Sequence, residues 1–98
     1  MLPVIYTPIA EKYFKKLKDK ALKKVFKEAV LNIRKNPAIG QVKTGDLSGL
    51  YSLDIYHNHT NYELAYRISK LENGDMVVII MAGTRENFYK ELKRYLFR

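Results

Sequence analysis

The chain has 98 residues, with 18 Lys or Arg and 10 Asp or Glu, so its formal charge at pH 7 is +8. Because 47% of the residues are hydrophobic and 29% are charged, the composition excludes a disordered chain and predicts one folded domain over residues 1–98. It has no cysteine, no signal-peptide start and no apolar run of about 20 residues, so we expect a cytoplasmic protein with no disulfide, thiolate chemistry or membrane partner.

The first third of the chain predicts a short strand and two helices. Leu2–Tyr6 is rich in β-branched and aromatic residues, which favour a strand. Thr7-Pro8 opens a helix, because Thr can cap free amides and Pro fits the first helical position. A break at Lys18-Asp19-Lys20, with Asp19 as the second cap, divides the 3.6-residue apolar period into a helical hairpin. Asn36-Pro37 ends the second helix, because Pro disfavours helical geometry in the residue before it.

The middle of the chain predicts a loop followed by three strands. Residues 37–49 hold three of the five glycines and are expected to form the loop. Leu50–Tyr56 and Tyr62–Ile68 both alternate apolar with polar residues, as half-buried strands do. Asn73-Gly74 predicts a type I′ turn. It leads into Met76–Ala82, which is apolar on both faces and therefore central in its sheet.

Arg85–Phe97 predicts the last helix, because its apolar residues share one face. The predicted order of elements is β-α-α-β-β-β-α. An antiparallel meander then packs against an N-terminal helical hairpin, with a C-terminal helix, so the fold class is α+β.

The predicted hairpin between the first two strands of the meander brings two acids together. If residues 57–60 form its loop, Asp54 lies directly opposite Glu63. A register shifted by one residue would mix apolar and polar faces, so the hydrophobic pattern selects this pairing. Two adjacent carboxylates can raise one pKa and supply a general base or acid. Alternatively both point into water, screened by Arg67 on the same face.

Arg85 is a second candidate site residue. It follows a Gly-Thr pair where the central strand turns into a helix, and helix-start amides with a guanidinium form a good phosphate site. Tyr89 lies one turn later on the same side. The alternative is an exposed Arg near a helix start and an interfacial Tyr.

The two histidines, His57 and His59, flank a turn tip, and His57 is the better candidate because it is nearer the strand end. With two His and no Cys, we expect no metal site and no cofactor.

Basic residues are concentrated in the N-terminal half. Residues 1–49 hold 11 Lys or Arg against 4 acids, whereas residues 50–98 hold 7 against 6. Helical spacing allows a lysine stripe that contacts nucleic-acid phosphates, or simply a solvated helix face. The candidate RNA-binding side chains are Lys12, Lys16, Lys20, Lys23, Lys27, Lys43 and Arg67.

Taken together and in order, four segments are similar to the RelE/ParE superfamily of toxins from bacterial type II toxin–antitoxin modules. The resemblance covers nearly the full length. It is carried by the paired Lys-rich helices ending in Asn36-Pro37, by Gly45–Tyr51, by Tyr62–Ile68 and by Met81–Tyr89.

In the RelE-like branch, the resemblance implies a ribosome-dependent, metal-independent mRNA endoribonuclease that inhibits translation. The implied partners are a cognate antitoxin, in an oligomeric complex, together with the ribosome and mRNA. Arg85 matches the Arg or His that stabilises the phosphate or serves in acid–base work. Tyr89 matches the aromatic residue that orients or stacks on the nucleotide. His57 falls where one ribosome-dependent branch has a strand-end His.

The chain also departs from this pattern. The RelE-like pattern has basic residues where this chain has Ser52, Asp54 and Glu63. Other branches use a sheet-face Glu as the base, so Glu63 or Asp54 could take that role with Arg85 stabilising charge. Two other functions stay open: a ParE-like toxin that inhibits DNA gyrase without nuclease activity, and an inactive member that serves only as a binding module.

Overall fold

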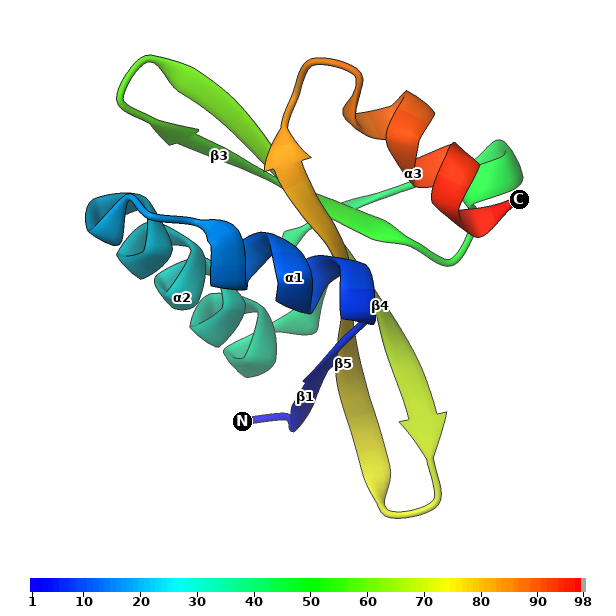
Figure 1. Ribbon diagram of the computed structural model, residues 1–98. Coiled ribbons are helices and arrows are strands. Elements are labelled where there is room, and N and C mark those ends of the chain that lie inside the picture. The colour runs from blue at the N-terminus through cyan, green and yellow to red at the C-terminus, as the bar shows by residue number, and fades with distance from the viewer. Residues whose placement is uncertain (98) are drawn as a thin grey trace.

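The computed structural model describes residues 1–97, and these form three α-helices and a five-stranded sheet (Figure 1). The strands are arranged in the order β1-β5-β4-β3-β2. The α+β class and the predicted order of elements are therefore confirmed, with one additional short strand. The elements are β1 (Val4–Tyr6), α1 (Pro8–Lys16), α2 (Lys20–Lys35), β2 (Gln41–Val42), β3 (Tyr51–His57), β4 (Thr60–Leu71), β5 (Gly74–Thr84) and α3 (Phe88–Leu96).

The helical hairpin is built as its capping residues predict. The Thr7 hydroxyl accepts a hydrogen bond from the Ala10 amide at 3.2 Å, and Pro8 is the first residue of α1. The Asp19 carboxylate accepts one from the Leu22 amide at 3.1 Å and begins α2. These local bonds satisfy amides that have no partner within the helix, and they therefore favour helix starts at these positions. The break predicted around Asp19 is confirmed, because α1 ends at Lys16 and α2 begins at Lys20.

The sheet differs from the predicted meander at both edges. β1 pairs in parallel with β5, with Val4 opposite Val77, so the sheet is mixed. The segment predicted as a loop contains β2, which pairs with β3. Neither pairing has a local sequence signal, because β1 and β5 come from opposite ends of the chain and β2 has only two residues.

The turns of the two hairpins differ from the prediction: the two-residue type I′ turn predicted between β4 and β5 is found between β3 and β4. In β3–β4, His57 pairs with Thr60, so the turn is Asn58-His59 instead of a four-residue loop. Both turn residues have positive φ, 50° and 64°, as a type I′ turn requires. In β4–β5, Leu71 pairs with Gly74, so the turn is one residue earlier than predicted, and positive φ falls on Gly74 alone. The predicted pairing of Asp54 with Glu63 is confirmed.

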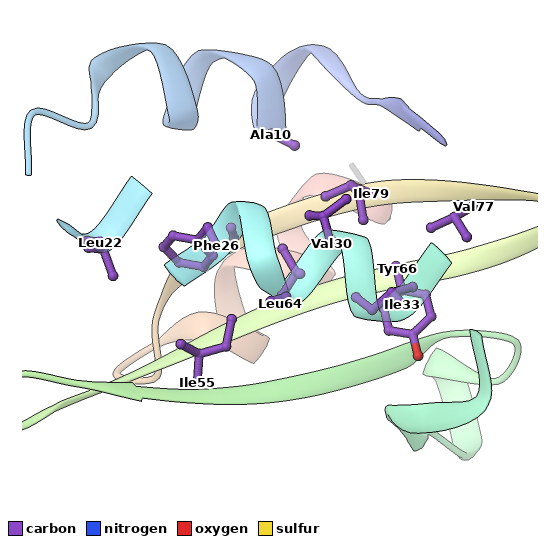
Figure 2. Close-up of a cluster of buried hydrophobic side chains, with 12 residues drawn as sticks. Ala10, Leu22, Phe26, Val30, Ile33, Ile55, Leu64, Tyr66, Val77 and Ile79 are labelled. Atoms are coloured by element: carbon purple, nitrogen blue, oxygen red, sulfur yellow. The ribbon is translucent and has the colours of Figure 1, made fainter. Parts of the chain in front are cut away.

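The sheet has two covered faces (Figure 1). The helical-hairpin face packs against α1 and α2, and the α3 face packs against α3 and the loop before β3. Strand residues alternate between them, so Leu64 and Ala65 belong to different cores. The core of the helical-hairpin face is drawn in Figure 2 and includes Phe26, Ile33, Leu64, Tyr66 and Ile79. The core of the α3 face includes Leu47, Leu50, Ala65, Val78, Ile80, Phe88 and Leu92.

Tyr66 connects the helical-hairpin core to the segment after α2. Its hydroxyl donates to the Pro37 carbonyl at 2.7 Å and accepts from the Gly40 amide at 2.9 Å. A Cβ atom at position 40 would lie 2.6 Å from this hydroxyl, so the close approach requires glycine.

The last helix begins three residues later than predicted, at Phe88. Asn87 has a left-handed backbone, with φ of 61°, and so cannot continue a right-handed helix from Arg85. Residues 85–87 instead form a turn, closed by a hydrogen bond from the Phe88 amide to the Arg85 carbonyl at 3.1 Å. Within residues 1–97, no helix has the length and apolar character needed to cross a membrane.

Candidate active site

Glu63 is a buried carboxylate at the centre of a polar cluster on the α3 face. It lies on β4, its side chain is 3% exposed, and each of its oxygens has a hydrogen-bond donor. Oε2 accepts from the Ser52 hydroxyl at 2.6 Å, and Oε1 accepts from Arg85 Nε at 3.2 Å. A buried carboxylate is tolerated only with such partners. No buried side-chain nitrogen or oxygen in residues 1–97 lacks one.

Arg85 joins this buried acid to a second, exposed one. It lies in the turn between β5 and α3, where its amide donates to the Asn61 carbonyl at 2.8 Å and so fixes the turn to β4. Its Nη2 atom lies 3.0 Å from Asp54 Oδ2, and the two side chains are 50% and 62% exposed. Because α3 begins at Phe88, Arg85 precedes the helix and does not open it. The guanidinium thus spans two carboxylates while half of it remains accessible to a ligand.

Tyr89 closes the cluster from the first turn of α3. Its hydroxyl donates to Ser52 Oγ at 2.9 Å and lies 3.4 Å from Glu63 Oε2. The three hydroxyl and carboxyl groups form a continuous hydrogen-bonded chain from Tyr89 through Ser52 to Glu63. Lys43 Nζ lies 4.7 Å from the centre of the Tyr89 ring, which places a further cation beside the cluster.

Burial raises the pKa of the Glu63 carboxyl above its ordinary value, because an apolar environment penalises the charged form. The Ser52 hydrogen bond lowers this pKa, Asp54 raises it, and the Arg85 hydrogen bond lowers it again. Burial and the neighbouring acid prevail, so Glu63 takes up a proton more readily than an exposed glutamate. A raised carboxyl pKa is suited to general acid–base work near neutral pH.

The structure brings Asp54, Glu63, Arg85 and Tyr89 together. The register predicted the pair of acids and helical spacing predicted Arg85 beside Tyr89, whereas only the family resemblance implied that the two pairs would meet. The alternative in which both acids point into water is wrong for Glu63, because α3 and the β5–α3 turn cover it. Screening by Arg67 is also wrong. Its Nη1 atom instead donates to Ser69 Oγ at 2.7 Å.

Ser52 is a member of the cluster that the sequence did not indicate as a candidate. It is 3% exposed and donates the shortest hydrogen bond to Glu63. The available signal was strand alternation, which puts Ser52 on the same face as Asp54.

His57 is not part of the cluster. Alternation along β3 places it on the face of Ile55, opposite to Asp54. Its backbone pairs with Thr60, but its side chain makes no hydrogen bond or ion pair with other described residues. His59, at the turn, lies with Nδ1 3.4 Å from the Tyr56 hydroxyl.

The predicted lysine stripe lies away from the cluster. Its residues are exposed on α1 and α2, which cover the opposite face of the sheet; they are Lys12, Lys16, Lys20, Lys23 and Lys27. Of the predicted RNA-binding residues, Lys43 alone contacts a cluster residue. No group of three or more His, Asp or Glu side chains in residues 1–97 is arranged to hold a metal ion.

Comparison with known proteins agrees with this fold. Residues 4–93 match the family described as ParE-like toxin of type II bacterial toxin–antitoxin systems. No curated protein matches the chain.

Among solved structures, the RelBE2 toxin–antitoxin complex from Mycobacterium tuberculosis is 27% identical, with a TM-score of 0.64 over 86% of this chain and 98% of that chain. A mutant of E. coli toxin RelE in the free state is 18% identical, with a TM-score of 0.72 over 98% of each chain. The YoeB/ParE toxin from Agrobacterium tumefaciens is 16% identical, with a TM-score of 0.72 over 86% of this chain and 99% of that chain.

Proposed function

We propose that this chain, which belongs to the ParE-like toxin family of type II bacterial toxin–antitoxin systems, is a toxin that cleaves mRNA on the ribosome. The observation that supports this proposal is the buried Glu63 carboxylate, bonded to Ser52 and Arg85 and reached by the Tyr89 hydroxyl. Attack of an RNA 2′-hydroxyl on the adjacent phosphate needs a base, an acid and a cation. The cluster offers one group for each role.

In the proposed reaction, Arg85 turns from Glu63 and Asp54 to the scissile phosphate and stabilises the charge that develops on its oxygens. The vacated Glu63 oxygen takes the proton of the attacking 2′-hydroxyl. The 2′-oxygen–phosphorus bond forms while the bond from phosphorus to the 5′-oxygen breaks. The products are a 2′,3′-cyclic phosphate and a 5′-hydroxyl.

Tyr89 donates the proton that the departing 5′-oxygen needs. After the carboxyl group has rotated so that its protonated oxygen faces Ser52, Glu63 donates this proton to Ser52, and Ser52 donates its own proton to the Tyr89 oxygen, along the same chain of hydrogen bonds. One proton therefore passes from the 2′-hydroxyl to the 5′-oxygen, and the side chains return to their starting states. Asp54, exposed and beside Arg85, is the alternative base.

The proposed partners follow from the family and from the charge. A type II toxin is expected to have a cognate antitoxin, and one similar structure is itself a toxin–antitoxin complex. The net charge of +8 favours docking on ribosomal RNA and mRNA phosphates in the cytoplasm.

The experiment is primer extension on mRNA from translating ribosomes to which purified protein has been added. We expect cuts at defined codon positions, and we expect Arg85→Ala to slow cleavage by about 10²–10³-fold, the usual effect of losing a donor to transition-state charge. Arg94→Ala is the matched control, because Arg94 is exposed on α3 and bonded only to Glu91. Equal cleavage by all three proteins would reject the assigned role of Arg85.

A second candidate function is inhibition of DNA gyrase without nuclease activity. It is favoured by the ParE-like description of the matched family and by the two carboxylates that occupy Arg85 in the free protein. Intact mRNA together with inhibited supercoiling would support this alternative. If the protein neither cuts mRNA nor inhibits supercoiling, the third alternative remains, a binding module that has lost activity.

A further inference from the structure

A surface recess of about 480 Å³ lies between the tip of the β3–β4 hairpin and the turn that joins β5 to α3. It is lined by His59, Thr60, Asn61, Thr84, Arg85 and Glu86. Arg85 therefore contributes to both this recess and the Glu63 cluster, whereas Glu63, Asp54 and Tyr89 do not line the recess. The volume is within the range of small-ligand sites and is sufficient for one nucleoside.

The two walls of the recess are held together by the backbone. The amide of Arg85 donates to the Asn61 carbonyl at 2.8 Å, so the β5–α3 turn is bonded to the start of β4. The opposite wall ends in the tight Asn58-His59 turn. We therefore expect the recess to exist before any ligand binds.

The lining is polar and suits the edge of a nucleobase. Thr60, Thr84 and Asn61 offer hydroxyl and amide groups that both donate and accept hydrogen bonds. The Glu86 carboxylate accepts bonds, as an exocyclic amino group requires. An apolar peptide side chain would leave these groups without partners, so the lining favours a base over a hydrophobic anchor.

An aromatic platform stands at the edge of the recess. Tyr56 is 66% exposed, and its hydroxyl is within 3.4 Å of His59 Nδ1. Tyr56 also pairs with Asn61 across the two strands, so both side chains lie on the same face of the sheet. Tyr56 is not part of the lining, but it contacts His59 and pairs with Asn61, which both line the recess, so we infer that the exposed ring lies next to it. Exposed aromatic rings on a sheet surface are a common means of stacking single-stranded RNA bases.

We propose that this recess binds the base of the nucleotide on the 3′ side of the scissile phosphate, with Tyr56 as the stacking residue and Asn61 and Glu86 at the base edge. The inference rests on the proposed function, in which Glu63 accepts the proton of the 5′-side nucleotide. The ribose of that nucleotide must then lie over Glu63, and the departing 5′-oxygen of the next nucleotide must lie within reach of the Tyr89 hydroxyl. With the phosphate on Arg85, the next nucleotide enters the recess on the other side of the guanidinium.

The test combines variants of Tyr56 with a change in the RNA. Two messages are compared, one intact and one lacking the base on the 3′ side of the mapped cut. We expect Tyr56→Ala to lower kcat/KM on the intact message by about tenfold, the usual scale of one stacking contact. Tyr56→Phe should stay within about twofold, because it keeps the ring. Removal of the base should abolish the difference between Tyr56→Ala and the unsubstituted protein.

Phe97→Ala is the matched control. It removes a ring that is 59% exposed, at the end of α3 farthest in sequence from the recess. An equal loss in Tyr56→Ala on both messages, or no loss on either, would overturn the inference while leaving the proposed cleavage intact.

A binding measurement separates this inference from the proposed function. The probe is a fluorescent single-stranded RNA with 2′-fluoro at the attacking nucleotide, which blocks cleavage, with or without the 3′-side base. Even if the protein cuts no message, tighter binding of the base-containing probe, with that preference abolished in Tyr56→Ala, would support the recess as a nucleobase site. Equal binding of both probes, or binding of neither, would overturn it.

Discussion

The two faces of the β-sheet carry different kinds of polar side chain. Beyond the helical-hairpin face, the outer surfaces of α1 and α2 carry eight exposed lysines and only two acids, so most of the net charge of +8 lies there. The α3 face instead holds one buried carboxylate, Glu63, with Ser52, Tyr89 and Arg85 around it. Net charge therefore indicates which surface can meet a large polyanion. The proposed chemistry depends on a few groups on the other face, and these hardly change the total charge.

The separation has a simple structural cause. Neighbouring residues on a strand point to opposite faces, so Leu64 enters the core under the helices while Glu63 enters the cluster beneath α3. A substitution in the cluster on the α3 face should therefore change activity. A substitution on the helical-hairpin face should change stability or docking and leave activity nearly unchanged. Four predictions test this division, in order of decreasing effect.

The largest expected effect is loss of cleavage in Glu63→Gln, which keeps the side-chain shape and removes the proton acceptor. We expect the single-turnover cleavage rate on programmed ribosomes to fall by about 10²–10⁴-fold, as is typical when a general base is removed. Ribosome affinity should be unchanged, because the lysines are on the other face. If Glu63→Gln and Asp54→Asn both keep full cleavage and toxicity, neither carboxylate is the base.

The second prediction concerns stability on the helical-hairpin face. Gly40→Ala places a Cβ atom 2.6 Å from the Tyr66 hydroxyl, so Tyr66 must move and its bonds to Pro37 and Gly40 weaken. We expect the free energy of unfolding to fall by about 1–3 kcal/mol in denaturant titrations. The folded fraction should keep its cleavage rate. A large drop in rate per folded molecule would contradict the independence of the two faces.

The third prediction concerns docking. Changing Lys20, Lys23 and Lys27 to Gln should weaken ribosome binding, and it should reduce the slope of log affinity against log salt by about 1 for each phosphate that a lysine no longer neutralises. Cleavage at saturating protein should not change. The matched control replaces the same number of charges elsewhere, at Lys70, Lys90 and Lys93. Equal weakening in both triple variants would assign the effect to net charge alone and return the α2 lysines to a solvated face.

The smallest effect is on the pH dependence of stability, because Ser52 and Arg85 partly offset the burial that raises the Glu63 pKa. With a raised pKa, the folded protein holds a proton that the unfolded chain has already released. The stability contributed by this proton is full below the ordinary value of 4.5 and is lost as pH rises through the folded pKa.

Unfolding free energies of the unsubstituted protein and Glu63→Gln, measured between about pH 4 and pH 8, check this. The stability of Glu63→Gln relative to the unsubstituted protein should rise with pH above 4.5 and then level off. A constant difference would mean that burial does not raise this pKa.

Much of the fold was predictable because its signals are local. Thr7 and Asp19 cap their helices with side chains only three residues from the amides they satisfy. The pairing of Asp54 with Glu63 followed from alternation, because a register shifted by one residue would mix apolar and polar faces. The start of α3 was predicted wrongly, since the left-handed Asn87 has no apolar pattern to indicate it.

The amino-acid sequence was enough to predict the α+β class, the helical hairpin and the β3–β4 register, and to suggest Asp54, Glu63, Arg85 and Tyr89 as candidate site residues, because each of these inferences depends on neighbours along one or two segments. Tertiary packing was needed to establish that Glu63 is buried, that Arg85 and not Arg67 is its cation, and that Ser52 joins it. It also placed His57 and the lysine stripe away from the cluster. Burial and its effect on a pKa depend on what packs over a side chain, and here α3 and the β5–α3 turn arrive from the far end of the chain.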